Sequence, residues 1–453
     1  MAAHSVDAEC WTQGGEGMGW STRYAAISYL RSSLWIVPLV ALVAEQAFIR
    51  VVFALDAYLL WVPGSGLTPG GTTSAIDVIV NLSMSFIVFT FGSMLVAIQV
   101  ASGQLTPRII ATTLLRDNRI RFTVGLFVFT MLFAQGTKAR IVNEVPPFVG
   151  TMVTLLGIAT VAAFLYLIDY TARLLRPIAI VRRIGDRGIK VIESVYPEPA
   201  AMPLRPAPAR PPPEGVGRVV AYDGHSAVVL AANLAALVAM ARAAGGVIEF
   251  LPRVGDFVAT GTPLFRLYEG ATALEDRRLR AQVAFGPERT IEQDSTFAFR
   301  VIVDVAIKAL SKAINDPTTA VIAIDQLHRL LRTTGLRHLH NDTLLDAEGR
   351  LRLIFPTPDW LDFLQLGFSE IRLYGAGNFQ VARRLRAMIG DLSATLPDSR
   401  RPALDRELAL LDATLVGRYT LPEDLALARE LDTQGLGGAV PRAPGGAGAR
   451  SRN

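Results

Sequence analysis

Hydrophobic residues gather in four long runs in the first part of the chain. The runs cover residues 34–53, 75–101, 122–137 and 147–168, and a helix needs roughly 20 residues to cross the hydrocarbon core of a bilayer. The third run is short, and we expect Lys138 and Arg140 beside it to reach outward to the membrane interface. The pattern predicts four transmembrane helices.

The second run carries a row of polar and small residues, which we call the polar seam. Its members share one face of a helix, because they are spaced four, seven, seven and four positions apart. They are Asn81, Ser85, Gly92, Gln99 and Gly103. One interpretation is a close contact with another helix. The alternative is the lining of a permeation route, because polar groups at membrane depth need a partner or water. In either case we expect lipid not to reach this face.

The first run contains an acidic residue, Glu45. A charge near the centre of a transmembrane helix costs about 2.5–3.5 kcal/mol on insertion scales. We therefore expect Glu45 to face protein or water, or to be protonated. Arg50 follows five positions later, which places it about 140° away around a helix, so the two are not natural partners. A tolerated acid inside the bundle and a proton-relay role both stay open.

Arginines predict how the chain crosses the membrane. Basic residues favour the cytoplasmic side, and they cluster in the second connection and after the fourth run, whereas the first connection has no charge. The clustered residues are Arg108, Arg116, Arg119, Arg121, Arg173, Arg176, Arg182, Arg183 and Arg187. We expect a multi-pass protein of the inner (cytoplasmic) membrane with both termini in the cytoplasm.

The pattern changes after the fourth run. A basic stalk leads into a segment with eight prolines between Pro197 and Pro213, which predicts a stiff, extended linker. Short strands with Gly, Asp and Pro turns follow, and then helical periodicity with one strand-like interruption. We expect a membrane helix bundle followed by a soluble α+β cytoplasmic domain with a small barrel-sandwich-like β part and an α-helical part. The predicted segments are 1–32 (polar), 33–176 (transmembrane), 177–213 (stalk and linker), 214–270 (β-rich), 271–434 (α-rich) and 435–453 (disordered tail).

Composition agrees with a membrane protein and excludes several other classes. Of the 453 residues, 51% are hydrophobic, too many for an ordinary soluble protein. The net charge of +5 is spread out or lies beside the hydrophobic runs, so we expect no nucleic-acid partner. A single cysteine, Cys10, excludes an intramolecular disulfide framework. The β-rich part resembles half of a biotinyl or lipoyl domain, but no lysine lies between Lys190 and Lys308, so we expect no cofactor.

The densest polar group in the second half spans FGPERTIEQD and INDPTTA. Arg300, Asp304 and Lys308 are spaced to form a charge ladder on one helix face, and Asp316 before Pro317 is typical of a helix start. The alternative is an acidic site for a divalent cation, although the spacing gives no ligand geometry. We favour a protein that is not an enzyme, with no metal. The candidate residues here are Glu288, Arg289, Glu292, Asp294, Asp304, Asn315 and Asp316.

Several segments resemble the bacterial predicted membrane proteins catalogued as domain of unknown function family 2254. They are SLWIVPL, FTFGSMLVAIQVASGQLTPRIIATTLLRD, VGDFVATGTPL, FGPERTIEQD with INDPTTA, and FSEIRLYGAGN. The resemblance implies an integral membrane protein with a cytoplasmic domain, and no activity. Because four helices are too few to enclose a wide route, we expect a homo-oligomeric channel- or transporter-like protein with a cytosolic regulatory domain. The alternative is a membrane-tethered scaffold or signalling protein. The expected partners are the bilayer, further copies of the chain, and a small ligand or protein in the cytoplasm.

The predicted topology can be tested with reporter fusions. Alkaline phosphatase, which is active only outside the cytoplasm, should be active when fused after Gly66 and inactive when fused after Glu198. A cytoplasmic reporter at the same two positions should give the reverse pattern. Phosphatase activity at Glu198 would contradict the four-span arrangement.

Overall fold

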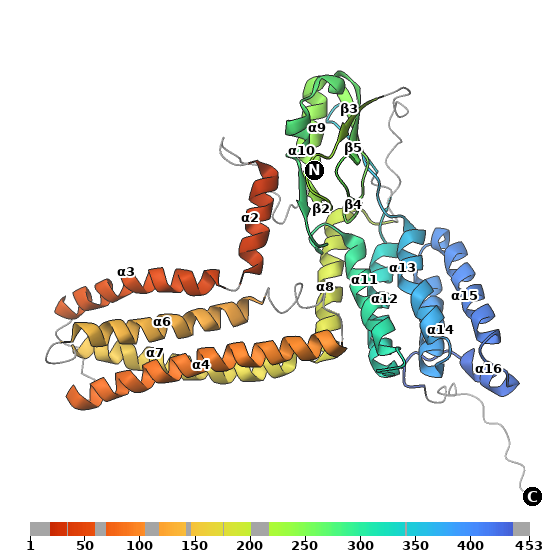
Figure 1. Cartoon of the computed structure of the whole chain (residues 1–453). Helices are drawn as coiled ribbons and strands as arrows, with labels where there is room; N and C mark the ends of the chain where they lie inside the picture. Colours follow the sequence, from red (N-terminus) through yellow and green to blue (C-terminus); the bar gives the residue numbers. More distant parts are fainter. Residues whose placement is uncertain are drawn as a thin grey trace, which may run out of the picture. The chain divides into compact units, whose positions relative to one another are not determined.

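The computed structural model describes residues 19–33, 35–58, 69–104, 117–141, 146–174, 176–200, 217–339 and 342–437. The chain forms two compact units (Figure 1). We call Ser28–Ile180 the four-helix unit, and Met1–Ile27 together with Val181–Asn453 the mixed unit. The predicted transmembrane segment, 33–176, falls inside the four-helix unit. Cys10, Arg108, Arg116, most of the proline-rich linker and most of the predicted tail lie outside the described residues.

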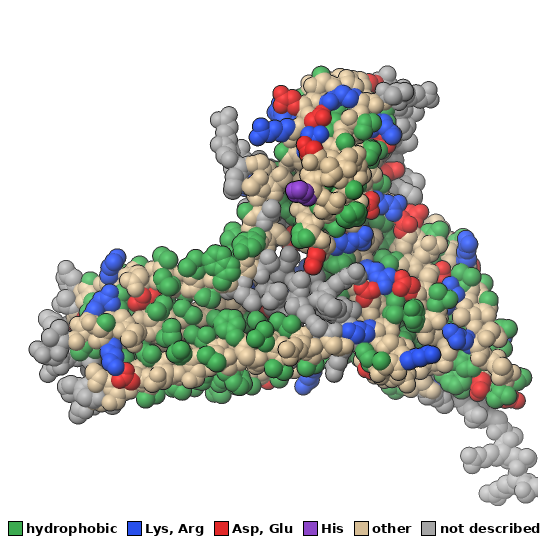
Figure 2. All heavy atoms as spheres, viewed as in Figure 1, with side chains coloured by type: hydrophobic (Ala, Val, Ile, Leu, Met, Phe, Trp, Pro, Cys, Tyr) green, Lys and Arg blue, Asp and Glu red, His purple; other side chains and the backbone are tan. Residues whose placement is uncertain are grey.

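Among the described residues, four helices are long and apolar enough to cross a membrane, as the sequence predicts. They are α3 (Ile36–Tyr58), α4 (Pro69–Gln104), α6 (Asn118–Arg140) and α7 (Pro147–Leu174). The third helix has 23 residues and is not short, because its charged ends continue the helix. Asp117 caps its start by accepting the backbone N–H of Arg119. Figure 2 shows hydrophobic side chains over most of the visible face of this unit.

Helix α6 is the central helix of the unit. In its apolar segment 56% of the residues are buried, against 17–22% in the other three. Glycines allow close packing, because a Cβ atom at Gly125 would lie 2.8 Å from Val37 of α3. On the other side, Thr160 of α7 donates a hydrogen bond to Thr130 at 3.0 Å, and both side chains are buried. Helix α6 therefore joins the bundle through both small residues and a polar contact.

Two further helices have residues in both units by sequence. They are α2 (Trp20–Ser32) and α8 (Pro177–Val195). Helix α8 has a strongly amphipathic pattern, with Ile180, Val181, Ile184 and Ile192 buried. The predicted basic stalk is thus a regular helix.

The mixed unit contains two β-sheets, and among the described strands neither closes into a barrel. The five-stranded sheet has the order β1-β5-β3-β8-β7, and the three-stranded sheet has the order β4-β2-β6. Only the β3–β8 pair is parallel in the larger sheet. β6, β7 and β8 lie after residue 270, in the segment 271–434 that the sequence predicts to be α-rich. The two sheets therefore contain strands from both the 214–270 segment and the 271–434 segment. The strands are β1 (Arg218–Ala221), β2 (Ala227–Ala232), β3 (Gly246–Phe250), β4 (Phe257–Val258), β5 (Pro263–Glu269), β6 (Val283–Gly286), β7 (Thr343–Leu345) and β8 (Leu351–Ile354).

Short helices cover and connect the strands. Helix α9 (Leu234–Ala244) begins at Asn233, which caps it, and ends at Gly245, whose φ of +69° suits glycine. It buries Leu237 and Ala241 against the core of the larger sheet. The remaining short elements are η2 (Gly270–Ala273) and α10 (Asp276–Arg280).

The rest of the mixed unit is helical. Helix α11 is almost entirely buried, whereas the helices around it are amphipathic. Phe299 of α11 contacts Phe363 of α13, with ring centroids 5.3 Å apart. The helices are α11 (Ser295–Ala309), α12 (Pro317–Gly335), α13 (Trp360–Gly375), α14 (Phe379–Thr395), η3 (Asp398–Arg400), α15 (Arg401–Val416) and α16 (Pro422–Ala428).

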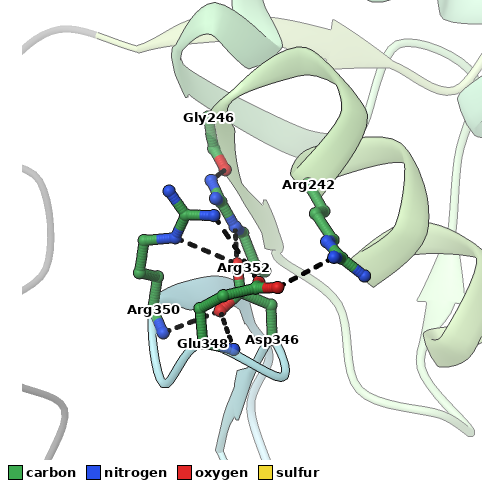
Figure 3. A network of polar contacts seen from close by, with 6 residues as sticks. All are labelled: Arg242, Gly246, Asp346, Glu348, Arg350 and Arg352. Carbon is green, nitrogen blue, oxygen red and sulfur yellow. Dashed lines mark hydrogen bonds and ion pairs between the residues drawn. The ribbon is translucent and has the colours of Figure 1, made fainter.

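A polar network fixes the β7–β8 hairpin to α9 and β3 (Figure 3). Asp346 in the turn accepts the backbone N–H groups of Glu348 and Arg350 and the Nε of Arg352. Arg352 then donates to the carbonyl of Gly246, and Arg242 of α9 donates to Glu348 at 2.8 Å. Burial disfavours the charged form of Asp346. The hydrogen bonds that it accepts and the neighbouring arginines nevertheless hold the pKa of Asp346 well below its usual range. The network ties the last two strands to the rest of the sheet.

Tight packing between α4 and α7 gives a stability prediction. A Cβ atom at Gly157 would lie 2.7 Å from the Cδ1 atom of Ile79, so we expect Gly157→Leu to separate the two helices. Overpacking of this kind costs about 1–3 kcal/mol. The purified variant in detergent should unfold at a lower temperature than the wild type. Ala159→Leu, at an exposed position of the same helix, is the control and should leave the melting temperature unchanged.

Candidate functional site

The polar seam lies on the exposed surface of α4. Each of its five residues is exposed in the single chain. The opposite face of the helix is buried and consists of Ser83, Thr90, Met94 and Ala97. Large apolar side chains flank the seam, among them Val88 at 64% exposure. Within the described residues, the seam therefore neither contacts another helix of its own chain nor lines a space inside it.

A cavity of about 160 Å³ lies elsewhere in the unit, between α4 and α7. Its polar lining consists of Thr90, Ser93 and Thr171, and the other lining residues are apolar, including Phe89, Met94 and Leu167. No member of the polar seam lines it. An apolar group fits this lining better than an ion does, because too few polar atoms are present to replace a hydration shell.

Glu45 of α3 is fully buried, and its carboxyl lies beside Gly136 of α6. Its Oε2 atom accepts a hydrogen bond from Gln46 Nε2 at 2.7 Å. Its Oε1 atom is buried and has no hydrogen-bond partner among the described residues. The structure places Glu45 away from the polar seam, since the seam is exposed on α4. These two candidate features belong to different sides of the bundle.

In the mixed unit, Asp294 is the most deeply buried member of the polar group that the sequence predicts. It is 4% exposed and caps α11, because its Oδ1 atom accepts the backbone N–H groups of Thr296 and Phe297. Its Oδ2 atom is buried without a hydrogen-bond partner, and Arg289 Nη1 lies 3.9 Å away. Burial raises the pKa of Asp294, although the hydrogen bonds from Thr296 and the charge of Arg289 oppose the shift.

The VGDF turn of the β region packs closely against Asp294. Gly255 has a φ of +97°, and a Cβ atom there would lie 2.3 Å from Asp294 Oδ2. Only glycine suits both the backbone conformation and the close approach. Next to this contact, burial raises the pKa of Tyr196 to about 12. Arg253 of the same turn forms an ion pair with Asp362 of α13 at 3.0 Å. The contacts join the sheets to the start of the helix bundle.

Apart from Arg289, the other members of the predicted group are not gathered around Asp294. Glu288 is exposed, and Glu292 accepts a hydrogen bond from the Tyr24 hydroxyl at 2.6 Å. Asp316 caps α12, as the sequence predicts, by accepting the backbone N–H of Thr319. Asn315, beside it, is exposed with a φ of +48°. Since α11 separates Asp294 from this turn by about 22 Å for 15 residues, the acids do not converge on one ion.

The predicted charge ladder extends to a partner on another helix. Arg300 donates to Asp304, one turn along α11, and to Glu370 of α13. The hydrogen bond from Arg300 lowers the pKa of Glu370. The sequence contained no signal for Glu370, because its distance along the chain from Arg300 is 70 residues.

A second group was missed by the sequence reasoning. His328 of α12 accepts a hydrogen bond from Arg384 of α14, so its Nε2 atom carries the proton and donates to Asp391 at 2.7 Å. Burial lowers the pKa of His328, which favours this neutral form. The available signal was the seven-residue spacing of Arg384 and Asp391, which places both on one face of a helix.

Within the described residues, no group of three or more His, Cys, Asp or Glu side chains is arranged to hold a metal ion. A model of the family described as "Predicted membrane protein (DUF2254)" matches residues 31–391. The chain belongs to this family. The match confirms the resemblance that the sequence motifs indicate.

Related proteins from two mycobacteria align with most of the chain. Uncharacterized proteins of Mycobacterium bovis and of Mycobacterium tuberculosis strain H37Rv are each 26% identical to it over 407 residues. Each comparison covers 86% of this chain and 77% of the relative. No solved structure matches the chain.

The buried carboxyl of Asp294 makes stability depend on pH. Because its pKa is raised in the folded state, the stabilising contribution is fully present below the unfolded pKa and is lost as the pH rises through the folded pKa. We therefore expect the wild type to lose stability relative to Asp294→Asn as the pH rises from about 4 toward neutrality. Chemical denaturation of both proteins across this range measures the difference. If the difference in unfolding free energy between the two proteins does not change with pH, the pKa of Asp294 is not raised by folding.

The capping role has its own test. Asp294→Ala and Asp316→Ala should each cost about 1 kcal/mol of unfolding free energy, because each removes a helix N-cap. Asp405→Ala, at an exposed position inside α15 that caps no helix, is the control. The loss of a biochemical activity without a loss of stability in either capping variant would instead indicate a functional acid.

Proposed function

We propose that the chain assembles with further copies of itself around the polar seam and forms a channel- or transporter-like membrane protein. The observation that carries the proposal is the position of the seam on the exposed side of α4. From Asn81 to Gln99 the seam extends about 27 Å along the helix, close to the roughly 30 Å depth of the hydrocarbon core. A polar face of this length needs protein or water beside it.

Geometry favours a route between subunits over a route inside one chain. The buried interior of the unit is filled by apolar clusters, such as the one that contains Phe127 and Leu167. The cavity between α4 and α7 is mainly apolar and excludes the seam residues. Copies related by rotational symmetry would bring their α4 helices together, and the seams would then face one another across the axis.

The mixed unit is the proposed regulatory part, in the cytoplasm. The chain passes from one unit to the other within α8, a continuous helix of 19 residues. A ligand that binds the mixed unit with different affinity in two states would shift the assembly between them. A rigid helical connection is suited to transmit such a shift.

An exposed apolar group supports the alternative function of a membrane-tethered scaffold. Leu373 and Tyr374 at the end of α13, and Val416 and Leu421 around the end of α15, are each 55–60% exposed. Arg372 near the end of α13 donates to the Thr414 hydroxyl near the end of α15 at 2.8 Å, so these side chains lie at adjacent ends of the two helices. Apolar surface of this kind is typical of a protein-binding site.

The double variant Asn81→Leu/Gln99→Leu separates these functions. For a pathway, we expect ion flux in liposomes to fall, because leucine removes the polar groups that would replace the hydration shell of a permeating ion, while native mass spectrometry still shows the oligomer. A loss of the oligomer would indicate a packing seam instead. Met84→Leu, at an apolar position that is 59% exposed on the same helix, is the control. Wild-type protein that is monomeric and passes no solute would contradict the proposal and favour the scaffold.

A further inference from the structure

Glu45 has the chemical surroundings of a neutral acid. It has no accessible surface, and its Oε1 atom has no hydrogen-bond donor among the described residues. Among the described residues, the polar group bound to it is the Gln46 amide, on Oε2. A carboxylate without further donors is costly to bury, whereas a protonated carboxyl needs fewer.

Arg140 is close to Glu45 but is bound elsewhere. A Cβ atom at Gly136 would lie 3.2 Å from Glu45 Oε1 and 3.1 Å from Arg140 Nη1, so the two groups flank the same glycine. The guanidinium donates instead to the carbonyl of Gly136 at 3.0 Å. The hydroxyl of Thr137, next along α6, is also buried without a partner. The absence of a side chain at Gly136 thus lets the acid, the cation and the Ile49 methyl group approach the same point of α6.

Other charged groups nearby are already paired or point away. Lys138 of α6 forms an ion pair with Asp77 of α4 at 2.5 Å. Arg50 of α3 is exposed. From α7, the residues packed into this part of the core are the apolar Val149 and Val153. Among the described residues, Arg140 is therefore the charged group that flanks the same glycine as Glu45.

We propose that Glu45 is a proton-binding site of the four-helix unit. In the arrangement that the structure shows, with Arg140 on the Gly136 carbonyl, the carboxyl holds its proton. When the proton passes to water at the α6 end of the bundle, the carboxylate pairs with Arg140, whose guanidinium turns from the Gly136 carbonyl to Glu45. A metal ion does not suit the site, because one carboxylate provides too few ligands and the guanidinium repels cations.

Infrared difference spectra of the full-length protein in liposomes test the proposal. Wild type minus Glu45→Gln should show the carbonyl band of a protonated carboxylic acid at neutral pH, and this band should give way to a carboxylate band as the pH rises. A carboxylate band at neutral pH would overturn the proposal. As a chemical check, dicyclohexylcarbodiimide, which reacts with protonated acids in apolar surroundings, should modify Glu45 and leave the exposed Asp77 unmodified.

The role of Arg140 has a separate readout. In Arg140→Gln the carboxylate has no cation to pair with, so the protonated band of Glu45 should persist to a pH at least about one unit higher than in the wild type. Arg140→Lys keeps the charge and should restore most of the wild-type titration. If the protonated band of Glu45 disappears at the same pH in Arg140→Gln as in the wild type, Arg140 does not pair with the carboxylate. If neither protein shows a protonated band, Glu45 is not a proton-binding site.

Discussion

The four-helix unit depends on the packing of α6 against its three neighbours. Helix α6 is the least apolar of the four helices, yet it has the most buried residues. Its glycines let α3 approach closely, and Thr130 forms a buried hydrogen bond with α7. Because small and polar residues drive helix association in a membrane, this composition suits a central helix. The more apolar helices, α3, α4 and α7, keep large hydrophobic surfaces for lipid.

Polar groups of the unit are divided between two environments as a result. Residues turned toward α6, such as Glu45, are enclosed by protein. Residues on the far side of α4, such as Asn81 and Gln99, are exposed along the whole helix. Enclosure limits the number of donors around a charge, whereas exposure leaves a polar face that another chain or water must cover. The two features differ in their chemistry, and we propose a bound proton for the first and an assembly surface for the second.

The mixed unit is organised around the contact between Gly255 and Asp294. The carboxyl caps α11, and the turn that contains Gly255 belongs to the β region. A side chain at position 255 would displace the carboxyl from the helix start. The ion pair of Arg253 with Asp362 reinforces the same junction at α13. The sheets and the helix bundle are thus joined at buried polar groups, where small changes of volume or charge are felt strongly.

The sequence by itself determined the elements that depend on local pattern. Hydrophobic runs of sufficient length specify the four helices, and Asp294 and Asp316 mark helix starts because capping involves residues two or three positions apart. Only the tertiary structure decided which way each face points and which distant residues meet. Periodicity places Asn81 and Gln99 on one face of α4, but their exposure depends on where α6 and α7 pack. Likewise, Gly255 meets Asp294, Arg300 meets Glu370, and β3 pairs with β8 through folding of the chain. Such contacts leave no local signal, since their free energy depends on residues that are far apart in the sequence.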